Sequence, residues 1–333
     1  MLSQEEIRAA IASVLNSAQS TPPIWSGGID LSQQRASVGL ANPETFRPAK
    51  FTPTGYRGLD VALGGGWANG ECSTLVAPSN VGKSCAMVNL ALRAALLGFA
   101  VAIISLEMRE FDIWKLIAGV LANVRRTAIR QGKMTNQETA RLAHAIRTLS
   151  SNNRIYVIDR RKFPVDSKHP EAPTMDAIGR TIQDGVRNCQ WTLVFIDYLG
   201  KVGPFNCEDL VRMPRLTNWS FDLAQRSNAH LVCLMQSGKA AYGRTEGKNK
   251  KPTVRLEDAK GAVEVIADFD NCIGLSRADW NTEKHVDPAD MKAITNKARQ
   301  GPGGVLPLMF YKSTGKIVEV TAYLAGNPTT TQP

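Results

Sequence analysis

The sequence predicts an α/β fold in which a mostly parallel central sheet is flanked by helices. Short apolar runs alternate with amphipathic segments from residue 54 onwards, as expected for buried parallel strands that are joined by helices. The run from Cys72 to Ala77 leads through a tight loop into an apolar-periodic segment at 85–97, which predicts strand, loop and helix in succession. The last apolar runs are separated only by short turns, which predicts an antiparallel edge.

The predicted elements divide the chain into an N-terminal helix with a linker (1–53), an α/β domain (54–320) and a C-terminal tail (321–333). Strands are expected at 72–77, 100–105, 155–158, 191–197, 229–235, 271–276, 292–297 and 305–311. Helices are expected at 85–97, 110–123, 136–150, 174–187 and 209–228. Prolines and basic side chains at 161–173 indicate a solvated loop.

The N-terminal helix is predicted at 4–18, where Ser3 and Glu6 have the spacing of a capping box. One face of this helix is apolar and carries Ile7, Ile11, Val14 and Leu15. A segment rich in Pro, Gly, Ser and Gln follows up to Pro53. Two interpretations remain open, because the helix can fold back on its own domain or dock on a neighbouring subunit.

The loop after the first strand has the pattern of a phosphate-binding loop, G-x-x-x-x-G-K-[ST], except that Ala77 stands in the first position. Backbone N–H groups of such a loop surround phosphate oxygens, and the helix N-terminus adds partial positive charge. Lys83 would reach the β and γ phosphates of ATP or GTP, and the Ser84 hydroxyl would bind Mg²⁺. The predicted nucleotide-binding positions are Pro78, Ser79, Asn80, Val81, Gly82, Lys83, Ser84 and Cys85.

Composition limits the remaining classes. The 333 residues are 43% apolar and 21% charged, as in a folded globular protein, and their formal net charge of +10 favours an anionic partner such as nucleic acid. The six cysteines form no C-x-x-C pair and the four histidines are far apart, so neither disulfides nor a zinc site is expected. No apolar run has the length of a membrane span and the N-terminus is acidic, so a cytoplasmic protein without membrane contact is expected.

Acidic residues follow two of the predicted strands. Asp197 ends the fourth strand and would hold the Mg²⁺ shell, mostly through water, unless it only caps the next turn. Glu107 follows the second strand at the carboxyl edge of the sheet, where α/β sheets bind ligands. A carboxylate there can polarise the attacking water, although a first-turn acid of the next helix would have the same position.

Three further polar residues are candidates for the site. Gln236 ends the fifth strand and would contact the γ-phosphate, unless it is simply a polar residue that leaves the strand. Lys297 and Arg299 lie at a strand end before a glycine-rich turn. They would stabilise transition-state charge in the site of an adjacent subunit, or they belong to a solvated basic hairpin.

A long polar loop at 237–262 is rich in Lys, Arg and Gly, and lies after the fifth strand near the predicted nucleotide edge. Its cations, among them Lys239, Arg244 and Lys260, suit a nucleic-acid backbone. Charge runs are usually only solvated, and Tyr242 is the one aromatic residue there, so base stacking is not indicated. The segment from Lys201 to Arg215 is a second candidate.

Several short motifs together resemble a known family, the RecA-like motor domain of the DnaB-type hexameric replicative helicases, including phage versions. The matching motifs are the phosphate loop 77–84, S-L-E-M at 105–108, I-D-Y-L at 196–199, Gln236 and K-A-R-Q-G-P-G-G at 297–304. They occur in the family's order over about residues 54–318. An alanine at the start of the phosphate loop is also usual in this family, so Ala77 agrees with the resemblance.

The resemblance implies a RecA-like P-loop NTPase fold and specific roles. Lys83 and Ser84 would bind the ATP phosphates and Mg²⁺, and Glu107 would be the catalytic glutamate. Asp197 would be the aspartate of the Mg²⁺ site, and Gln236 would be the γ-phosphate sensor. Lys297 and Arg299 would be the piston and the finger that act on the site of the next subunit. The segment 258–261 resembles the start of the family's central DNA-binding loop, which adds Lys260 and Gly261 to the predicted DNA contacts.

The implied function is an ATP-dependent replicative DNA helicase, a homohexameric ring that moves on single-stranded DNA and unwinds duplex in a bacterial or phage-infected cytoplasm. Residues 1–53 resemble only the linker helix that packs on the next subunit in this family, so the primase and the helicase loader are expected to be separate proteins. The first alternative is a RecA/RadA/KaiC-like DNA-dependent ATPase without unwinding activity. The second is a nucleotide-switched loader or adaptor that barely hydrolyses ATP.

Overall fold

The computed structural model describes residues 25–26, 29–30, 49–152, 154–164, 173–203, 209–237, 268–277, 279 and 286–320. The chain forms two compact units, Met1–Lys50 and Phe51–Pro333. In the first unit, β1 (Trp25–Ser26) and β2 (Ile29–Asp30) pair antiparallel. The helix predicted at 4–18 lies outside the described residues, and so does the tail predicted at 321–333.

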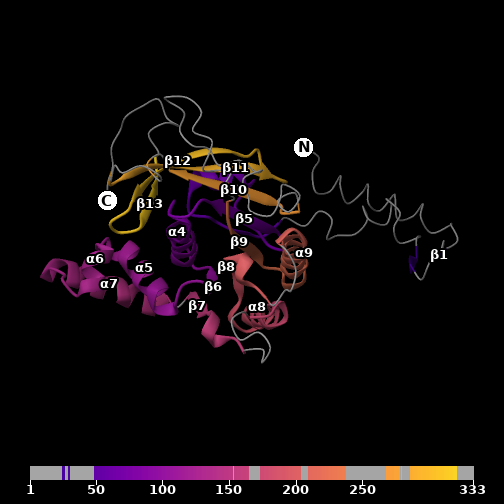
Figure 1. Ribbon diagram of the computed structural model, residues 1–333, viewed down its shortest axis with the longest axis horizontal. Coiled ribbons are helices and arrows are strands. Elements are labelled where there is room, and N and C mark those ends of the chain that lie inside the picture. Colours follow the sequence, from indigo (N-terminus) through magenta and orange to yellow (C-terminus); the bar gives the residue numbers. More distant parts are fainter. Residues whose placement is uncertain are drawn as a thin grey trace, which may run out of the picture. The chain divides into compact units, whose positions relative to one another are not determined.

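Nine described strands of the second unit form one sheet in the order β13-β12-β11-β10-β5-β9-β8-β6-β7 (Figure 1). The six parallel strands are β5 (Cys72–Ala77), β6 (Ala100–Ser105), β7 (Ile155–Asp159), β8 (Trp191–Asp197), β9 (His230–Gln236) and β10 (Asn271–Arg277). The antiparallel edge consists of β11 (Ala289–Ala298), β12 (Gly304–Tyr311) and β13 (Lys316–Glu319). The predicted α/β class, the mostly parallel sheet and its antiparallel edge are therefore confirmed.

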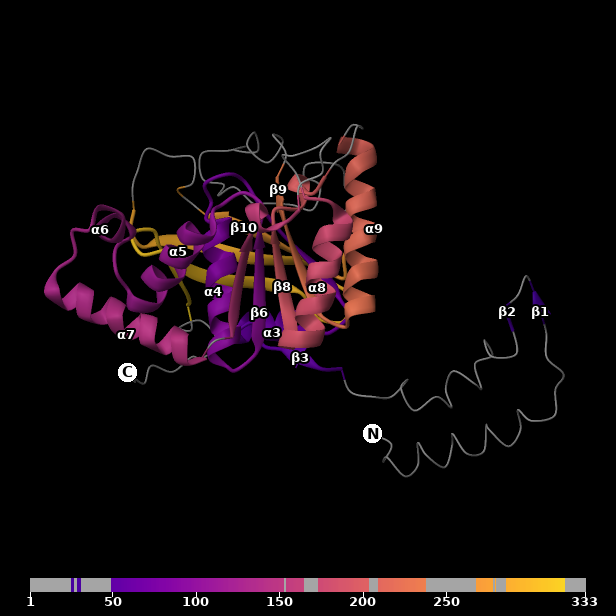
Figure 2. The same ribbon diagram turned by 90° about the horizontal axis from the view of Figure 1, so that it is seen from below.

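Helices cover both faces of this sheet (Figure 2). One buried cluster joins α4 (Lys83–Leu96) and α5 (Glu110–Ala122) to strand residues such as Leu75 and Ile103. A second joins α8 (Met175–Cys189) and α9 (Asp209–Ser227) to the next residue of the same strands, Val76 and Ile104. Since neighbouring residues of a strand point to opposite faces, the continuous apolar runs of β5 and β6 fill both cores.

Five further short elements lie among the described residues of this unit. The strands β3 (Phe51–Thr52) and β4 (Trp67–Ala68) pair with each other on either side of the short helix α3 (Arg57–Ala62). Two single 3-10 turns follow strand ends, η3 (Arg160–Lys162) after β7 and η4 (Leu199–Lys201) after β8. Each described helix is either too short or too polar to cross a bilayer.

The structure adds several short elements that the sequence pattern does not predict, among them α3, α6 (Arg126–Gln131) and β13. The turn η3 also enters the segment 161–173, which the sequence predicts as a loop. The helix α6 has six residues and precedes α7 (Asn136–Asn152), which the sequence predicts. The strand β13 has four residues. Such short segments contain too few periods for hydrophobic periodicity to show, and β13 is held by its pairing with β12.

Candidate nucleotide site

The phosphate loop connects β5 to α4 at the carboxyl edge of the parallel strands. Asn80 and Gly82 have positive φ angles of 65° and 118°. A Cβ added to Gly82 would lie 3.0 Å from the Phe310 ring, so the loop path requires glycine there. Gly82 is the N-cap of α4, and no side chain of the cap accepts from the first N–H groups of the helix. A helix N-terminus without a side-chain cap suits a bound anion.

Ser84 and Asp197 meet beside this loop. Ser84 Oγ donates to Asp197 Oδ2 over 3.1 Å, and Asp197 has no exposed surface. Asp197 Oδ1 is buried and has no hydrogen-bond partner within the described part of the chain. Burial raises the pKa of Asp197, Lys83 opposes this shift, and the charge of Glu107 adds to it. A hydroxyl beside a buried carboxylate with an unsatisfied oxygen fits a hard cation such as Mg²⁺.

Glu107 extends from a short connection between β6 and α5. Ser105 Oγ accepts from Met108 N over 3.1 Å, and Leu106 N donates to Asp197 O over 2.6 Å, which ties the connection to the end of β8. The Glu107 side chain is exposed. The helix α5 has Arg109 as its N-cap and Glu110 and Asp112 as its first-turn acids, so Glu107 serves neither purpose.

Lys83 and Gln236 also face this edge. Lys83 Nζ lies 5.3 Å from the centroid of the Tyr198 ring, which follows Asp197 in the chain. Gln236 pairs with Ala77 in the sheet and its Nε2 donates to Ser79 Oγ over 2.6 Å. The amide of Gln236 therefore contacts the phosphate loop directly.

Lys297 and Arg299 do not join this group within one chain. Lys297 pairs with Cys272, which pairs with Thr74 near the amino end of β5, and Arg299 follows one residue beyond the end of β11. Arg299 lies at the level of Cys72, which is five residues from Ala77, or about 17 Å along an extended strand. An arginine side chain does not cover that distance to the phosphate loop of its own subunit.

The structure adds Arg277, which the sequence reasoning missed. It is the last residue of β10, its side chain is 9% exposed, and its Nη1 donates to Val81 O in the phosphate loop over 3.1 Å. Arg277 Nε also pairs with Asp279 Oδ1 at 2.7 Å. Its signal in the sequence is a charged residue at the end of an apolar strand, as for Asp197. The predicted DNA contacts Lys239, Arg244, Lys260 and Gly261 lie outside the described residues.

Residues 52–319 match the family model of the DnaB-like helicase C terminal domain. The chain is 23% identical to the replicative DNA helicase DnaC of Bacillus subtilis over 269 residues, which are 80% of this chain and 56% of that protein. It is 26% identical to the replicative DNA helicase DnaB of Buchnera aphidicola over 273 residues, 77% of this chain and 53% of that protein. The chain thus spans about half the length of these curated relatives.

Solved structures share the fold. One of them, described as an ATPase domain, superposes with a TM-score of 0.70 at 19% identity, covering 88% of this chain and 99% of that one. The DnaB-like replicative helicase whose interactions with primase were described gives 0.72 at 19% identity, covering 94% and 72%. The family model covers most of the chain, including the phosphate loop and the nine described strands of the sheet. The chain therefore belongs to the family of the DnaB-like helicase C-terminal domain.

Proposed function

We propose that this protein is an ATP-hydrolysing motor that moves on single-stranded DNA and unwinds duplex DNA, as a replicative helicase. The observation that carries the proposal is the separation of the catalytic groups. Lys83, Ser84, Glu107 and Asp197 gather at the carboxyl edge of the sheet, whereas Arg299 lies at the level of the amino end of β5. Each subunit would therefore supply the phosphate-loop half of one site and the Arg299 half of a neighbouring subunit's site.

The residues at the carboxyl edge suit ATP hydrolysis. Ser84 and Asp197 would hold Mg²⁺, which neutralises phosphate charge when bound, and Lys83 would neutralise the β and γ oxygens. Glu107 is exposed on the same side and would accept a proton from the attacking water or orient it. Gln236 would contact the γ-phosphate and transmit its loss through Ser79 to the phosphate loop.

Transition-state charge on the transferred phosphoryl group needs further cations, which Arg299 and Lys297 of an adjacent subunit would supply. This requires a homo-oligomer, and we propose a hexamer. ATP with Mg²⁺ would bind between subunits, and hydrolysis would move the loops that carry Lys239, Arg244 and Lys260 along the DNA strand. The net charge of +10 supports binding to a polyanion such as DNA.

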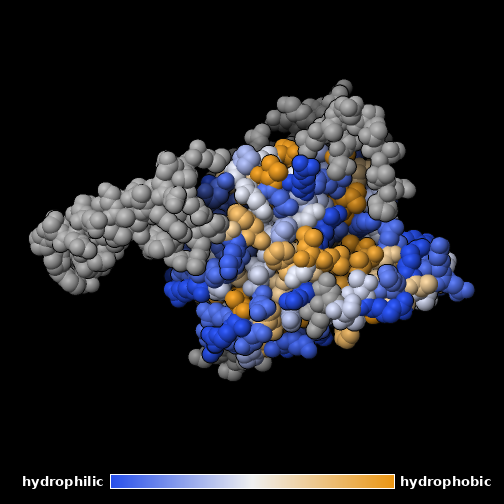
Figure 3. All heavy atoms as spheres, turned by 180° about the vertical axis from the view of Figure 1, so that it is seen from behind, coloured by the Kyte–Doolittle hydropathy of each residue, from blue (hydrophilic) through white to orange (hydrophobic). Residues whose placement is uncertain are grey.

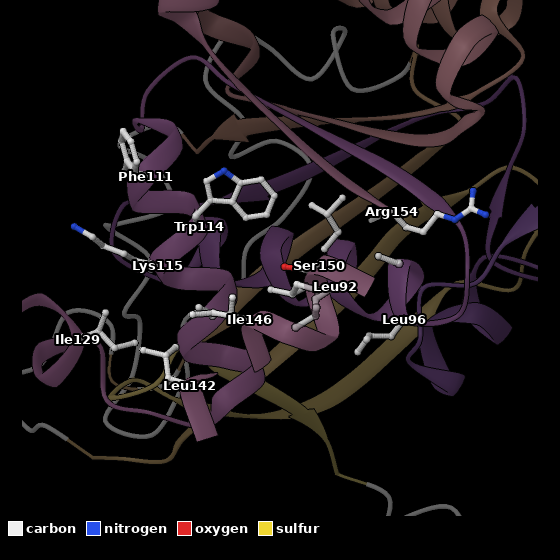
Figure 4. A pocket seen from close by; sticks show the side chains of 14 residues that line it. Leu92, Leu96, Phe111, Trp114, Lys115, Ile129, Leu142, Ile146, Ser150 and Arg154 are labelled. Atoms are coloured by element: carbon white, nitrogen blue, oxygen red, sulfur yellow. The ribbon is translucent and has the colours of Figure 1, made fainter. Parts of the chain in front are cut away.

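An apolar groove supports assembly. Figure 3 shows hydrophobic side chains gathered on the face opposite to that of Figure 1. Between α4, α5 and α7 lies a cavity of about 470 Å³, and Figure 4 shows Phe111 and Trp114 of α5 beside Leu142 and Ile146 of α7 along it. Phe111 is 70% exposed and Ile146 is 51% exposed. The apolar face predicted for the helix at 4–18 of a neighbouring subunit fits this groove.

The partners follow from the same proposal. One structural relative is described together with its interactions with primase. We propose that a separate primase and a separate loader act with this helicase, in the cytoplasm of a bacterial or phage-infected cell.

A second candidate function is a KaiC-like or RecA-like DNA-dependent ATPase that does not unwind duplex. It has structural support, because a KaiC-like protein of Pyrococcus horikoshii superposes with a TM-score of 0.54 at 14% identity. A nucleotide-switched loader is disfavoured, since Glu107 and Arg299 would be superfluous in a protein that barely hydrolyses ATP.

Native mass, DNA-stimulated ATPase activity and unwinding of a forked duplex test the proposal together. We expect a hexamer with ATP and single-stranded DNA, stimulation of hydrolysis by that DNA, and strand separation, with all ATP-dependent activity lost in Lys83→Ala. Stimulation without strand separation would favour the second candidate. A monomer that DNA does not stimulate would contradict both.

A further inference from the structure

The carboxylate of Asp270 connects the end of β11 to the beginning of β5. Asp270 Oδ2 accepts from Cys72 N over 2.9 Å, and Asp270 Oδ1 pairs with Arg299 Nη1 at 3.0 Å. The backbone repeats both links, since Asp270 N donates to Cys72 O over 2.8 Å and Arg299 N donates to Asp270 O over 3.0 Å. One residue thus fixes the place of Arg299 relative to the strand that leads to the phosphate loop.

The two members of this ion pair differ in exposure. The Asp270 side chain is 6% exposed, whereas the Arg299 side chain is 47% exposed. A guanidinium carries five N–H donors in a planar fork, and the pair with Asp270 occupies one nitrogen. The exposed N–H groups of the guanidinium can bind a phosphate of the nucleotide that is held by another subunit. The contact therefore orients Arg299 without enclosing it.

The residue after Asp270, Asn271, is anchored by hydrogen bonds to β5 and to Glu71, which precedes that strand. The adjacent Asn271 donates through Nδ2 to Glu71 Oε2 over 3.2 Å and to Ser73 Oγ over 3.1 Å. Ser73 Oγ in turn lies 2.8 Å from Nε2 of the fully buried His230. This network anchors the backbone beside Asp270, while Cys72 N holds its carboxylate. A group that positions a catalytic side chain must itself be held in place, because small displacements reduce transition-state stabilisation.

Charge around Arg299 agrees with this role. Burial and the neighbouring Arg299 lower the pKa of Lys297, and Asp270 opposes that shift. A carboxylate near the two cations therefore offsets their mutual repulsion. Asp270 thus contributes negative charge beside both cations at this edge of the sheet.

We propose that Asp270 is a positioning residue for hydrolysis in the adjacent subunit, because its buried carboxylate presents Arg299 to the nucleotide bound there. This inference rests on the proposed function, in which Arg299 acts in trans. Asp270 does not touch the nucleotide of either subunit and acts only through Arg299.

A double-mutant cycle on ATP hydrolysis tests the inference. Asp270→Asn keeps an oxygen acceptor for Cys72 N and removes the charge opposite Arg299. In the oligomer we expect kcat to fall by about tenfold to a hundredfold with little change in KM, since the phosphate loop stays intact. The double variant with Arg299→Ala should be no slower than Arg299→Ala alone, because Asp270 then has nothing to position. Asp290→Asn, an exposed carboxylate of β11, is the matched control.

Each other outcome has a defined meaning. An unchanged kcat in Asp270→Asn, or a further loss of the same size on top of Arg299→Ala, overturns the positioning role. Full activity of Arg299→Ala instead contradicts the trans-acting arginine of the proposed function. If Asp270→Asn does not fold, Asp270→Glu keeps the charge but moves the carboxylate by one methylene. It should then lower kcat at unchanged KM, and wild-type kcat in that variant would overturn the inference.

Mixed oligomers separate the two subunits of a composite site. Subunits with Lys83→Ala cannot use their own site but offer an intact Asp270 and Arg299. Their mixture with Asp270→Asn subunits should regain basal ATPase activity above the sum of the separate proteins, as should their mixture with Arg299→Ala. Recovery in the Arg299→Ala mixture without recovery in the Asp270→Asn mixture would place the defect of Asp270→Asn in its own subunit and overturn the inference.

Discussion

Ser84 Oγ donates to Asp197 Oδ2 over 3.1 Å, while the second oxygen of Asp197 is buried without a partner in the described ranges of the chain. This pair joins the first turn of α4 to the end of β8. The arrangement is costly without a cation, because a buried carboxylate with an unsatisfied oxygen has lost its hydration.

The first prediction concerns the stability of the apo protein. Burial raises the pKa of Asp197, so the free energy of unfolding decreases as the pH rises from the unfolded-state pKa through the folded-state pKa, and the destabilisation is complete above the latter. Asp197→Asn should therefore raise the melting temperature of the apo protein at about pH 7.5 and abolish most of the stabilisation by MgATP. Differential scanning calorimetry with and without MgATP measures both. An apo melting temperature that falls in the variant would show that Asp197 is not strained by burial.

The second prediction concerns the attacking water. Glu107→Gln should lower the kcat of ATP hydrolysis by about a hundredfold or more while ATP binding stays near that of the wild type, because the amide cannot accept the proton. Steady-state ATPase rates and binding of a fluorescent ATP analogue check this. Glu110→Gln is the matched control, since that carboxylate lies in the first turn of α5 and forms an ion pair with Lys162 at 3.7 Å. Full ATPase activity in Glu107→Gln would disprove the assignment.

The third prediction concerns pH and His230. Its ring is fully buried, with Nδ1 2.7 Å from Ala68 O, and burial lowers its pKa from 6.5 to about 4. The unfolded state binds the proton first, so the free energy of unfolding should decrease as the pH falls from about 6.5 to 4, by up to about 3 kcal/mol.

Urea unfolding over this pH range measures that loss. His230→Gln should reduce the slope of stability against pH, whereas the exposed control His144→Gln should not. Identical slopes in the wild type and His230→Gln would show that this ring does not titrate on unfolding.

The fourth prediction concerns assembly. Phe111→Ser and Ile146→Ser remove apolar side chains that are largely exposed in one subunit, so each variant should keep the melting temperature of the isolated subunit within a few degrees. If the helix at 4–18 of a neighbour fills the groove, both should weaken the oligomer. Analytical ultracentrifugation across a concentration series measures this, with Val305→Ser, an exposed apolar residue of β12, as the control. An unchanged assembly would mean that this groove does not hold the ring.

The strands that carry the candidate nucleotide site were predictable, because both their composition and their position in the chain indicate buried parallel strands. The predicted bounds of β5, β6 and β8 agree with the observed ones, since each is a continuous apolar run that must be buried on both faces. Parallel strands also place their carboxyl ends at one edge, which is why Asp197 and Gln236 could be assigned to the same edge as Lys83 from their place in the chain.

The remaining features depend on register and burial, which one sequence does not contain. The position of Arg299 follows from the pairing of β11 with β10, and composition cannot predict that register. Arg277 was missed because a charged residue at a strand end is usually solvated, whereas here it is buried against Val81 O. The alternative for Glu107 as a first-turn acid was removed only by the observed start of α5 at Glu110.

The placement of Arg299 and the phosphate loop on opposite edges of one sheet also restricts symmetry. A two-fold dimer uses the same surface patch on both subunits, so it would have to bring both edges into a single interface. If Arg299 acts in trans, as proposed, head-to-tail contacts complete each site once and make all subunits equivalent. They close into a ring if the rotation between neighbours divides a full turn, and otherwise continue as a helix. A closed ring has as many complete sites as subunits, whereas every open chain has one fewer.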